Sequence, residues 1–337
     1  MNMKYRACPV PWQHMEVGHE HNVYLCCHIP TPVGNLAKDG VMDAWSSPAA
    51  QQVRTSILDG SYAFCRRSTC PILYQPEGRS SRHWTEDTMA IRPTFNPLQA
   101  LLGPLRVSLS NERSCNLRCP SCRSDRYLRE ADEATCRVWE KIASDRCLLE
   151  NAELLRVSGS GEFMSSPRLL AIVQQILRDH PHLGLELLSN LTTFGAEQIR
   201  ELGFQDRIRS IQGSIDARTP ETYEKVRGGC FSAVMRNLES LAAIKDDDGF
   251  DLTMGFVVQE PNFREISSFA ALAISLGARA SFWRVQSWGH LPSSEFESLD
   301  VADPGHPRHA ELVDMLRDPL LLSRHVWLND LLRLTPG

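Results

Sequence analysis

The sequence predicts an α/β fold with a parallel sheet, preceded by a small cysteine-rich domain. Six apolar, strand-like runs alternate with helical patterns between residue 105 and about residue 288. Such alternation is typical of strand–helix units joined by right-handed crossovers, in a doubly wound sheet or an open barrel. The first 80 residues instead hold five cysteines and four histidines. The 337-residue chain is long enough for one large α/β domain and a small one.

The composition favours a globular protein without a nucleic-acid or membrane partner. Hydrophobic residues make up 42%, charged residues 23%, and the net charge is −5. No basic face is concentrated enough for nucleic acid, and no apolar run approaches a membrane span. The chain start lacks a signal-peptide pattern, so its eleven cysteines indicate metal or redox use in a reducing compartment. A cytoplasmic location is therefore predicted.

The cysteine-rich domain is predicted over residues 1–80. A strand is expected at 23–25 and a helix at 43–58, which ends at Asp59-Gly60. So small a domain needs a staple such as a metal centre, and a zinc module built from Cys and His is one alternative. Residues 81–104 are rich in proline and glycine and are predicted to be a linker.

The α/β domain is predicted over residues 105–290, with strands that are buried on both faces, as their continuous apolar runs indicate. Its strands are expected near 105–110, 154–158, 184–189, 207–215, 251–258 and 279–286. The best helix covers 166–179 with Ser166 as its start signal, and a second begins at Thr219-Pro220. A third is expected from Asn262, with Glu265 in capping-box position. Residues 291–337 read as a polar loop followed by one or two short helices.

The loop after the first strand carries the strongest chemical signal. Cys115, Cys119 and Cys122 follow a Cys-x3-Cys-x2-Cys spacing with no fourth cysteine close behind. Three thiolates suit three corners of an iron–sulfur cluster and leave one iron open, whereas structural zinc normally takes four ligands. The triplet alone leaves both metals possible and favours the cluster.

Polar and glycine residues gather at the other strand ends, where parallel α/β folds place their active sites. Gly159-Ser160-Gly161-Glu162 follows the second strand and Ser189-Asn190 the third. Ser214 and Asp216 end the fourth strand, and Val258 ends the fifth. The glycines allow a ligand to approach the backbone, and Glu162 offers a carboxylate to an ammonium group.

Five segments of the chain resemble the radical S-adenosylmethionine superfamily in their order and spacing. They are CNLRCPSC, SGSGE, LLSN, SIDARTPETYEKVRGG and FVVQEPNFREI. The resemblance implies a partial (β/α)6, TIM-like barrel with a [4Fe–4S] cluster. It also implies S-adenosylmethionine bound to the open iron and cleaved by one-electron reduction. The resulting 5′-deoxyadenosyl radical abstracts a hydrogen atom from the substrate.

The same resemblance assigns roles to individual residues. Cys115, Cys119 and Cys122 would hold the cluster, while Gly159, Gly161 and Glu162 would meet the methionine ammonium. The further S-adenosylmethionine contacts would be Ser189, Asn190, Ser214, Arg227 and Val258. Cys230 is a candidate hydrogen donor, because radical enzymes can use a thiol in that role. A surface cation is the alternative reading of Arg227.

The N-terminal region resembles the SPASM/twitch auxiliary-cluster domain through CPVPWQHM, VYLCC, GNL and FCRRSTCP. That domain usually follows the barrel and here precedes it. The match implies a second [4Fe–4S] cluster on Cys8, Cys26, Cys65 and Cys70, with Cys27 as the rival of Cys26.

Together these motifs predict a radical S-adenosylmethionine enzyme of a biosynthetic pathway. Oxidation, epimerisation and coupling all begin with hydrogen abstraction and stay open. The expected substrate is a small sugar or nucleoside-type molecule, with a ribosomally made peptide as the alternative, and the expected electron donor is a flavodoxin or ferredoxin. A zinc-stapled binding protein and an iron–sulfur electron carrier are the alternatives from other classes.

Overall fold

The computed structural model describes most of the chain and divides it into two compact units. The described residues are 8–66, 70, 73, 96–123, 128–287 and 291–335. The first unit comprises Met1–Ser114 and Arg129–Glu186, and the second Cys115–Leu128 and Leu187–Gly337. Residues 81–95 of the predicted linker lie outside the described residues. The domain boundaries expected from the sequence stay predictions.

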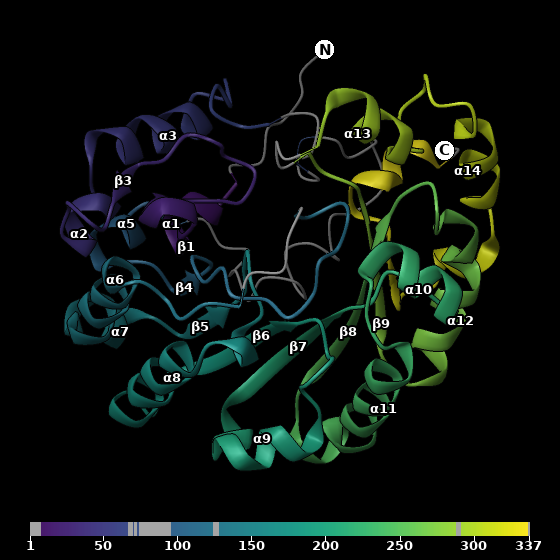
Figure 1. The fold of residues 1–337 in the computed structure, drawn as a ribbon. Helices are drawn as coiled ribbons and strands as arrows, with labels where there is room; N and C mark the ends of the chain where they lie inside the picture. The colour runs from purple at the N-terminus through teal and green to yellow at the C-terminus, as the bar shows by residue number, and fades with distance from the viewer. Residues whose placement is uncertain are drawn as a thin grey trace. The chain divides into compact units, whose positions relative to one another are not determined.

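The first unit is built on a sheet whose strands run in the order β3-β2-β1-β4-β5 (Figure 1). These strands are β1 (His14–Val17), β2 (Asn22–Tyr24), β3 (Gly34–Asn35), β4 (Arg106–Leu109) and β5 (Leu154–Val157). Strand β4 pairs in parallel with β1 and β5, while β2 pairs antiparallel with β1 and β3. Strand β6 (Gly184–Ser189) lies at the boundary of the two units in the sequence.

The three parallel strands of this sheet have one apolar and one polar face. The apolar face consists of residues at most 1% exposed: Met15, Val17, Val107, Leu109, Leu155 and Val157. The opposite face, called the polar face below, carries His14, Glu16, Arg106, Ser108 and Arg156, with Leu154 as its one apolar member. Because side chains alternate along a strand, the sequence RVSL yields this division directly. Strand β4 is buried on both faces, as the sequence predicted, although one of these faces is polar.

Four described helices of the first unit begin at a side chain that caps them. The helices of this unit are α1 (Val10–Gln13), α2 (Val41–Trp45), α3 (Pro48–Leu58), α5 (Gln99–Leu102), α6 (Glu133–Ser144), α7 (Arg146–Asn151) and α8 (Pro167–Asp179), with short 3₁₀ turns η1 (His19–His21) and η2 (Phe163–Ser165). The four with a side-chain cap are α3, α6, α7 and α8. Ser166 caps α8 by accepting from the N–H of Leu169, as predicted. The single helix expected at 43–58 is two, because Ser47 caps a new helix that starts at Pro48.

The second unit contains four parallel strands in the order β7-β8-β9-β10. They are β7 (Ile208–Ser214), β8 (Asp251–Val258), β9 (Arg279–Arg284) and β10 (Val326–Trp327). Phe256, Phe269 and Phe282 form a fully buried aromatic cluster, with ring centroids 4.7–5.9 Å apart, that packs α12 (Ile266–Ser275) on β8 and β9. This cluster fixes the strands whose ends carry the candidate site.

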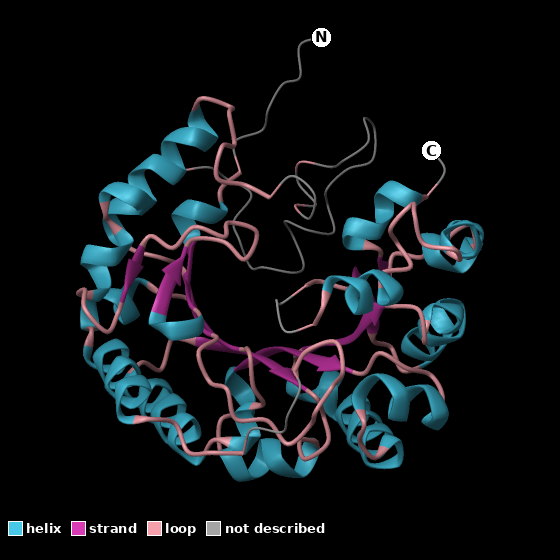
Figure 2. Ribbon diagram, turned by 45° about the horizontal axis from the view of Figure 1, so that its top comes forward, coloured by secondary structure: helices cyan, strands magenta, loops and turns pink. Residues whose placement is uncertain are grey.

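Helices accompany the strands of the second unit, and in Figure 2 they lie along the outer side of the strands. Besides α12 they are α9 (Ala196–Leu202), α10 (Pro220–Arg227), α11 (Phe231–Asp248), α13 (Ser293–Leu299) and α14 (His309–Met315), with 3₁₀ turns η3 (Gln205–Arg207), η4 (Phe263–Glu265), η5 (Pro319–Leu322) and η6 (Asn329–Leu334). The fold is α/β with parallel strands, as the sequence predicted.

Glu265 does not form the predicted capping box. Its carboxylate instead accepts hydrogen bonds from the N–H of Arg218 (2.5 Å) and the hydroxyls of Thr219 (2.6 Å) and Thr222 (2.8 Å). These donors lie at the start of α10, so the carboxylate ties α10 to η4. A tertiary contact has thus replaced the local one.

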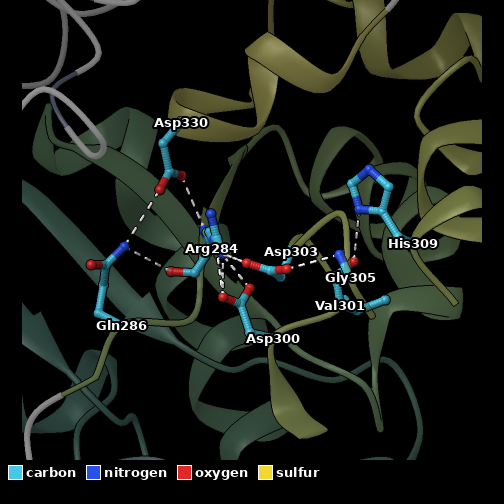
Figure 3. A network of polar contacts seen from close by, with 8 residues as sticks. All are labelled: Arg284, Gln286, Asp300, Val301, Asp303, Gly305, His309 and Asp330. Carbon is cyan, nitrogen blue, oxygen red and sulfur yellow. Dashed lines mark hydrogen bonds and ion pairs between the residues drawn. The ribbon is translucent and has the colours of Figure 1, made fainter. Parts of the chain in front are cut away.

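The C-terminal segment is fastened to β9 by Arg284 (Figure 3). The guanidinium forms a buried ion pair with Asp300 and a longer one with Asp303 (3.3 Å). The backbone N–H of Arg284 donates to Asp330 (3.0 Å). This network holds the turn after α13 and the start of η6 against β9, although residues 291–337 showed no motif.

In the described part of the chain, no helix combines the length and the apolar character that crossing a membrane requires.

Candidate functional site

The loop with Cys115, Cys119 and Cys122 folds as a tight turn in the second unit. The N–H groups of Cys122 and Arg123 donate to the carbonyl of Cys119 at 2.9 and 3.1 Å. Cys119 is buried, whereas Cys122 is exposed and Cys115 half-buried. Burial raises the pKa of Cys119, and nearby Arg227 opposes that rise. The loop therefore presents thiols of unequal environment on one short turn.

Asn190, at the end of β6, holds the first part of this loop. Its amide nitrogen donates to Oδ1 of Asn116 (2.9 Å) and lies 3.9 Å from the sulfur of Cys115. Asn116 in turn donates to the hydroxyl of Thr192 (2.7 Å), which itself donates to Asn190 (2.6 Å). Asn190 was predicted as a ligand contact, and here it positions the cysteine loop. Asn116 was missed, although its place directly after Cys115 was a usable signal.

A buried ion pair supports the second cysteine. Arg227 Nη2 lies 2.7 Å from Oδ2 of Asp216, and Arg227 Nη1 lies 3.8 Å from the sulfur of Cys119. Although burial disfavours its charge, Asp216 and Cys119 hold the pKa of Arg227 above its usual value. Asp216 is fixed in turn, because its Oδ1 accepts from the N–H of Val257 (2.7 Å). Arg227 is thus a buried, paired cation, and the surface-cation reading is wrong.

The glycine-rich loop of the first unit packs against the stem that leads into the cysteine loop. The N–H of Glu162 donates to the carbonyl of Ser114 (2.7 Å), and Glu162 is 2% exposed. A Cβ on Gly161 would lie 2.4 Å from the same carbonyl oxygen. Gly161 therefore permits a backbone–backbone approach, where the sequence had suggested an approach by a ligand.

Glu112, in the same stem, is a further residue that the sequence reasoning missed. Its Oε1 accepts from the N–H groups of Arg113 (2.8 Å) and Ser114 (2.6 Å). Its Oε2 is buried and has no hydrogen-bond partner among the described residues. Its acidic side chain, three residues before Cys115, was the available signal.

Four cysteines of the first unit surround one small cavity. Cys8, Cys26, Cys65 and Cys70 line it together with His28, and the remaining walls are apolar: Val10, Pro11, Ile29, Ile57, Tyr62 and Leu73. Burial, with smaller contributions from Cys70 and Cys65, raises the pKa of Cys8 to about 12. Cys27 is exposed and does not line the cavity.

The cavity offers the donor set of an iron–sulfur cluster. Thiolates around a cluster bind different irons and so stand around a volume, whereas the ligands of zinc share one centre. Four thiols without a carboxylate are the donor set of such a cluster.

Comparison with protein families agrees with the cysteine group of the first unit. Residues 8–71 match the model of the SPASM family, described as an iron–sulfur cluster-binding domain. The mycofactocin maturase MftC of Mycobacterium ulcerans is 30% identical over 213 residues, which cover 62% of this chain and 53% of the relative. The PqqA peptide cyclase of Methylorubrum extorquens is 26% identical over 195 residues, which cover 56% and 47% of the two chains.

These matches support the resemblance to the radical S-adenosylmethionine superfamily. It spans about half the length of the curated relatives it matches. Among solved structures, SuiB of Streptococcus suis is similar with a TM-score of 0.49 and 13% identity, over 83% of this chain and 60% of that one.

The other residues expected to serve a radical S-adenosylmethionine site lie at strand ends or near them. Ser189, at the end of β6, uses its hydroxyl to accept from the N–H of Leu191 (3.0 Å). Ser214 ends β7, in register with Gly255 of β8, and the fully buried Val258 ends β8. Gly159 has a φ of +148° and lies against Ser110. Their contacts with S-adenosylmethionine stay predictions.

Cys230 lies at the exposed start of α11. Its sulfur is 3.3 Å from the hydroxyl of Ser232, and hydrogen bonds with Ser232 lower its pKa. Its role as hydrogen donor stays a prediction.

Proposed function

We propose that this protein reductively cleaves S-adenosylmethionine and uses the resulting radical to modify a ribosomally made peptide. The cleavage of S-adenosylmethionine is proposed because of the turn with Cys115, Cys119 and Cys122. Asn190 contacts this turn at Cys115, and Arg227 contacts it at Cys119. The three thiols would bind one [4Fe–4S] cluster, and Cys8, Cys26, Cys65 and Cys70 a second. When bound, the clusters supply electrons and S-adenosylmethionine supplies the hydrogen-abstracting radical.

The residues of the chain have separate tasks in this proposal. Asn190 and Asn116 orient the loop at Cys115, and Arg227 donates toward the sulfur of Cys119. Gly161 lets the loop with Glu162 approach the backbone of the cysteine-loop stem. The Glu162 carboxylate is proposed to bind the methionine ammonium. Arg227, Ser189, Ser214 and Val258 are proposed to complete the S-adenosylmethionine site.

The peptide is proposed because of the relatives' names. One is a maturase and the other a peptide cyclase. This favours the second of the substrate classes that the sequence left open over a sugar or nucleoside. A flavodoxin or ferredoxin is proposed as the electron donor.

Iron and sulfide analysis after anaerobic reconstitution tests the cluster assignment. We expect about eight irons per chain, falling to about four in a Cys115→Ala/Cys119→Ala/Cys122→Ala variant, as two four-iron clusters imply. Cys147→Ala, in α7, is the control and keeps the wild-type count. The intact protein also releases 5′-deoxyadenosine under reduction. Zinc in place of iron in both proteins contradicts the proposal.

Deuterium transfer tests the substrate class. The reduced protein is incubated with the peptide fraction or the small-molecule fraction of fully deuterated host cells. Deuterium in 5′-deoxyadenosine from the peptide fraction alone supports a peptide substrate. Deuterium from the small-molecule fraction alone contradicts it and favours the metabolite.

A further inference from the structure

The polar face of the first unit carries buried charge that the cysteine sites do not use. Strands of parallel sheets are normally apolar on both faces, because both are buried. Here His14 and Arg106 lie side by side in register and are 4% and 2% exposed. His14 Nε2 is 2.9 Å from the hydroxyl of Ser108. Burying such groups lowers stability unless they gain partners, so a polar face of this kind calls for an explanation.

Arg106 has more donors than its surroundings satisfy. Its Nη2 donates to Oε1 of Glu186 at 2.6 Å. Its Nε and Nη1 are buried and have no hydrogen-bond partner among the described residues, and the same holds for Nδ1 of His14. A buried donor without a partner lowers the stability of the fold. These two donors lie on opposite edges of the guanidinium, and each can bind one carboxylate oxygen, whereas both bidentate forks include the Nη2 that Glu186 occupies. The Oε2 of Glu186 is likewise buried and has no hydrogen-bond partner among the described residues.

A second cation adds to this positive charge. Arg156 lies in register with Ser108, next to Arg106 on the polar face, and is half-buried. Within the described part of the chain its guanidinium forms no ion pair and no hydrogen bond. The two arginines therefore face one paired carboxylate, Glu186.

The remaining ionisable groups do not cancel this charge. Burial, with a smaller contribution from Cys27, raises the pKa of Glu16 to about 7, against the opposing effects of Ser110, Arg156 and His28. Glu16 is thus only about half ionised at neutral pH. His14 stays neutral, because burial, Arg106 and Arg156 lower its pKa to about 3. A net charge between zero and plus one suits a singly charged ligand better than a doubly charged one.

We propose that the polar face binds one carboxylate group of the peptide substrate, through Arg106 and Arg156. The identity of the ligand as a peptide rests on the proposed function. The arrangement of the residues on the polar face is independent of that function. Cys27 and His28 lie close enough to act on Glu16 electrostatically, so the bound carboxylate would lie near the loop that carries Cys26.

Three small probes test the site on the full, cluster-loaded protein. N-acetylglutamine carries only an α-carboxylate, its isomer N-acetylisoglutamine only a side-chain carboxylate, and N-acetylglutamine amide carries neither. By calorimetry we expect at least one carboxylate probe to bind about tenfold more tightly than the amide, the size of one charge-assisted hydrogen bond. The isomer that binds more tightly shows whether the recognised carboxylate of the peptide is its C-terminal end or an acidic side chain.

Arg156→Gln should bring the affinities of the three probes together, because it removes a cation and leaves no carboxylate unpaired. Arg178→Gln is the matched control, an exposed arginine of α8, and should keep the tenfold preference. Equal affinities in the wild type, an unchanged preference in Arg156→Gln, or tighter binding of inorganic phosphate would each overturn the proposal.

Release of 5′-deoxyadenosine by the wild type distinguishes a failure of the carboxylate site from a failure of the proposed function. A protein that cleaves S-adenosylmethionine but does not discriminate among the probes refutes this site alone. A protein that discriminates but never cleaves refutes the proposed function and leaves the carboxylate site standing.

Discussion

Arg227 joins a carboxylate to a cluster-loop thiol: its guanidinium lies 2.7 Å from Asp216 and 3.8 Å from the sulfur of Cys119. Asp216 has a φ of +60° and accepts from the N–H of Val257. The amide of Asn262 also donates to the carbonyl of Asp216 (2.9 Å). The ends of β7 and β8 therefore hold the charge that faces Cys119, and several predictions on stability and metal content depend on such contacts.

Removing Arg227 should leave Asp216 as an unpaired buried carboxylate. We expect Arg227→Gln to lower the free energy of unfolding by about 3 kcal/mol, and the double variant Asp216→Asn/Arg227→Gln to recover most of it. Urea unfolding provides the measurement. Arg279→Gln is the control, since its pair with Asp251 is partly exposed and is worth at most about 1 kcal/mol. Equal losses in Arg227→Gln and Arg279→Gln would show that burial of the first pair has no special effect.

Gly161→Ala should disturb the stem of the cysteine loop. The added methyl group would lie 2.4 Å from the carbonyl oxygen of Ser114, and a backbone atom cannot move aside as a side-chain end can. We expect a lower melting temperature and less iron on the Cys115 loop. Gly203→Ala serves as control, because its only penalty is the positive φ of +75°, about 1 kcal/mol. The steric argument fails if the two variants melt at the same temperature.

Cys26 and Cys27 should differ in their effect on iron content. Cys26→Ser removes a thiol that lines the cavity with Cys8, Cys65 and Cys70, whereas Cys27 lies outside that cavity. We expect Cys26→Ser to lose about four irons, one cluster, and Cys27→Ser to keep them. Iron analysis of the two anaerobically reconstituted variants decides the matter, and the opposite pattern would make Cys27 the ligand.

Glu16 should make the protein less stable as pH rises. Burial first, and Cys27 second, raise its pKa from 4.5 to about 7 in the folded state. The folded state therefore holds more protons than the unfolded state between these values, so stability falls as pH rises through this window. Glu16→Gln removes the ionisation, and we expect its unfolding midpoint to exceed that of the wild type at pH 8.

The stability advantage of Glu16→Gln should shrink as the pH is lowered. It should vanish below about pH 4.5, where the Glu16 carboxyl is neutral in both the folded and the unfolded state. Glu20→Gln, at an exposed carboxylate, is the control for removing a surface charge. An advantage that is constant across pH would point to packing and not to ionisation.

The elements that the sequence predicted best were those with continuous apolar runs and local caps. The strands at 184–189 and 251–258 have the expected bounds, and Ser166 and Thr219 cap their helices as expected. Local signals suffice where burial and a nearby side-chain oxygen decide the structure.

Elements that depend on partners distant in the chain were not predictable. The four residues of β1 have no strand signal of their own and are placed by pairing with β4. Glu265 followed the capping-box spacing, yet three donors at the start of α10 outcompete the local partner. The candidate site shows the same division. Its cysteines were visible in the sequence, whereas the partners of Arg227 and Asn190 were not.

The cysteine loop has a consequence for the order of events during synthesis. Asn190, Thr192 and Arg227, which hold the loop in place, all follow it in the chain. Cys8, Cys26, Cys65 and Cys70 are, by contrast, complete once residue 70 has been made. Because translation proceeds from the N-terminus, these four thiols emerge from the ribosome before the cysteine loop, whereas the neighbouring strand β1 waits for its partner β4. The loop with Cys115 must wait until residue 227 has emerged, so iron delivery to the two cysteine groups is separated in time.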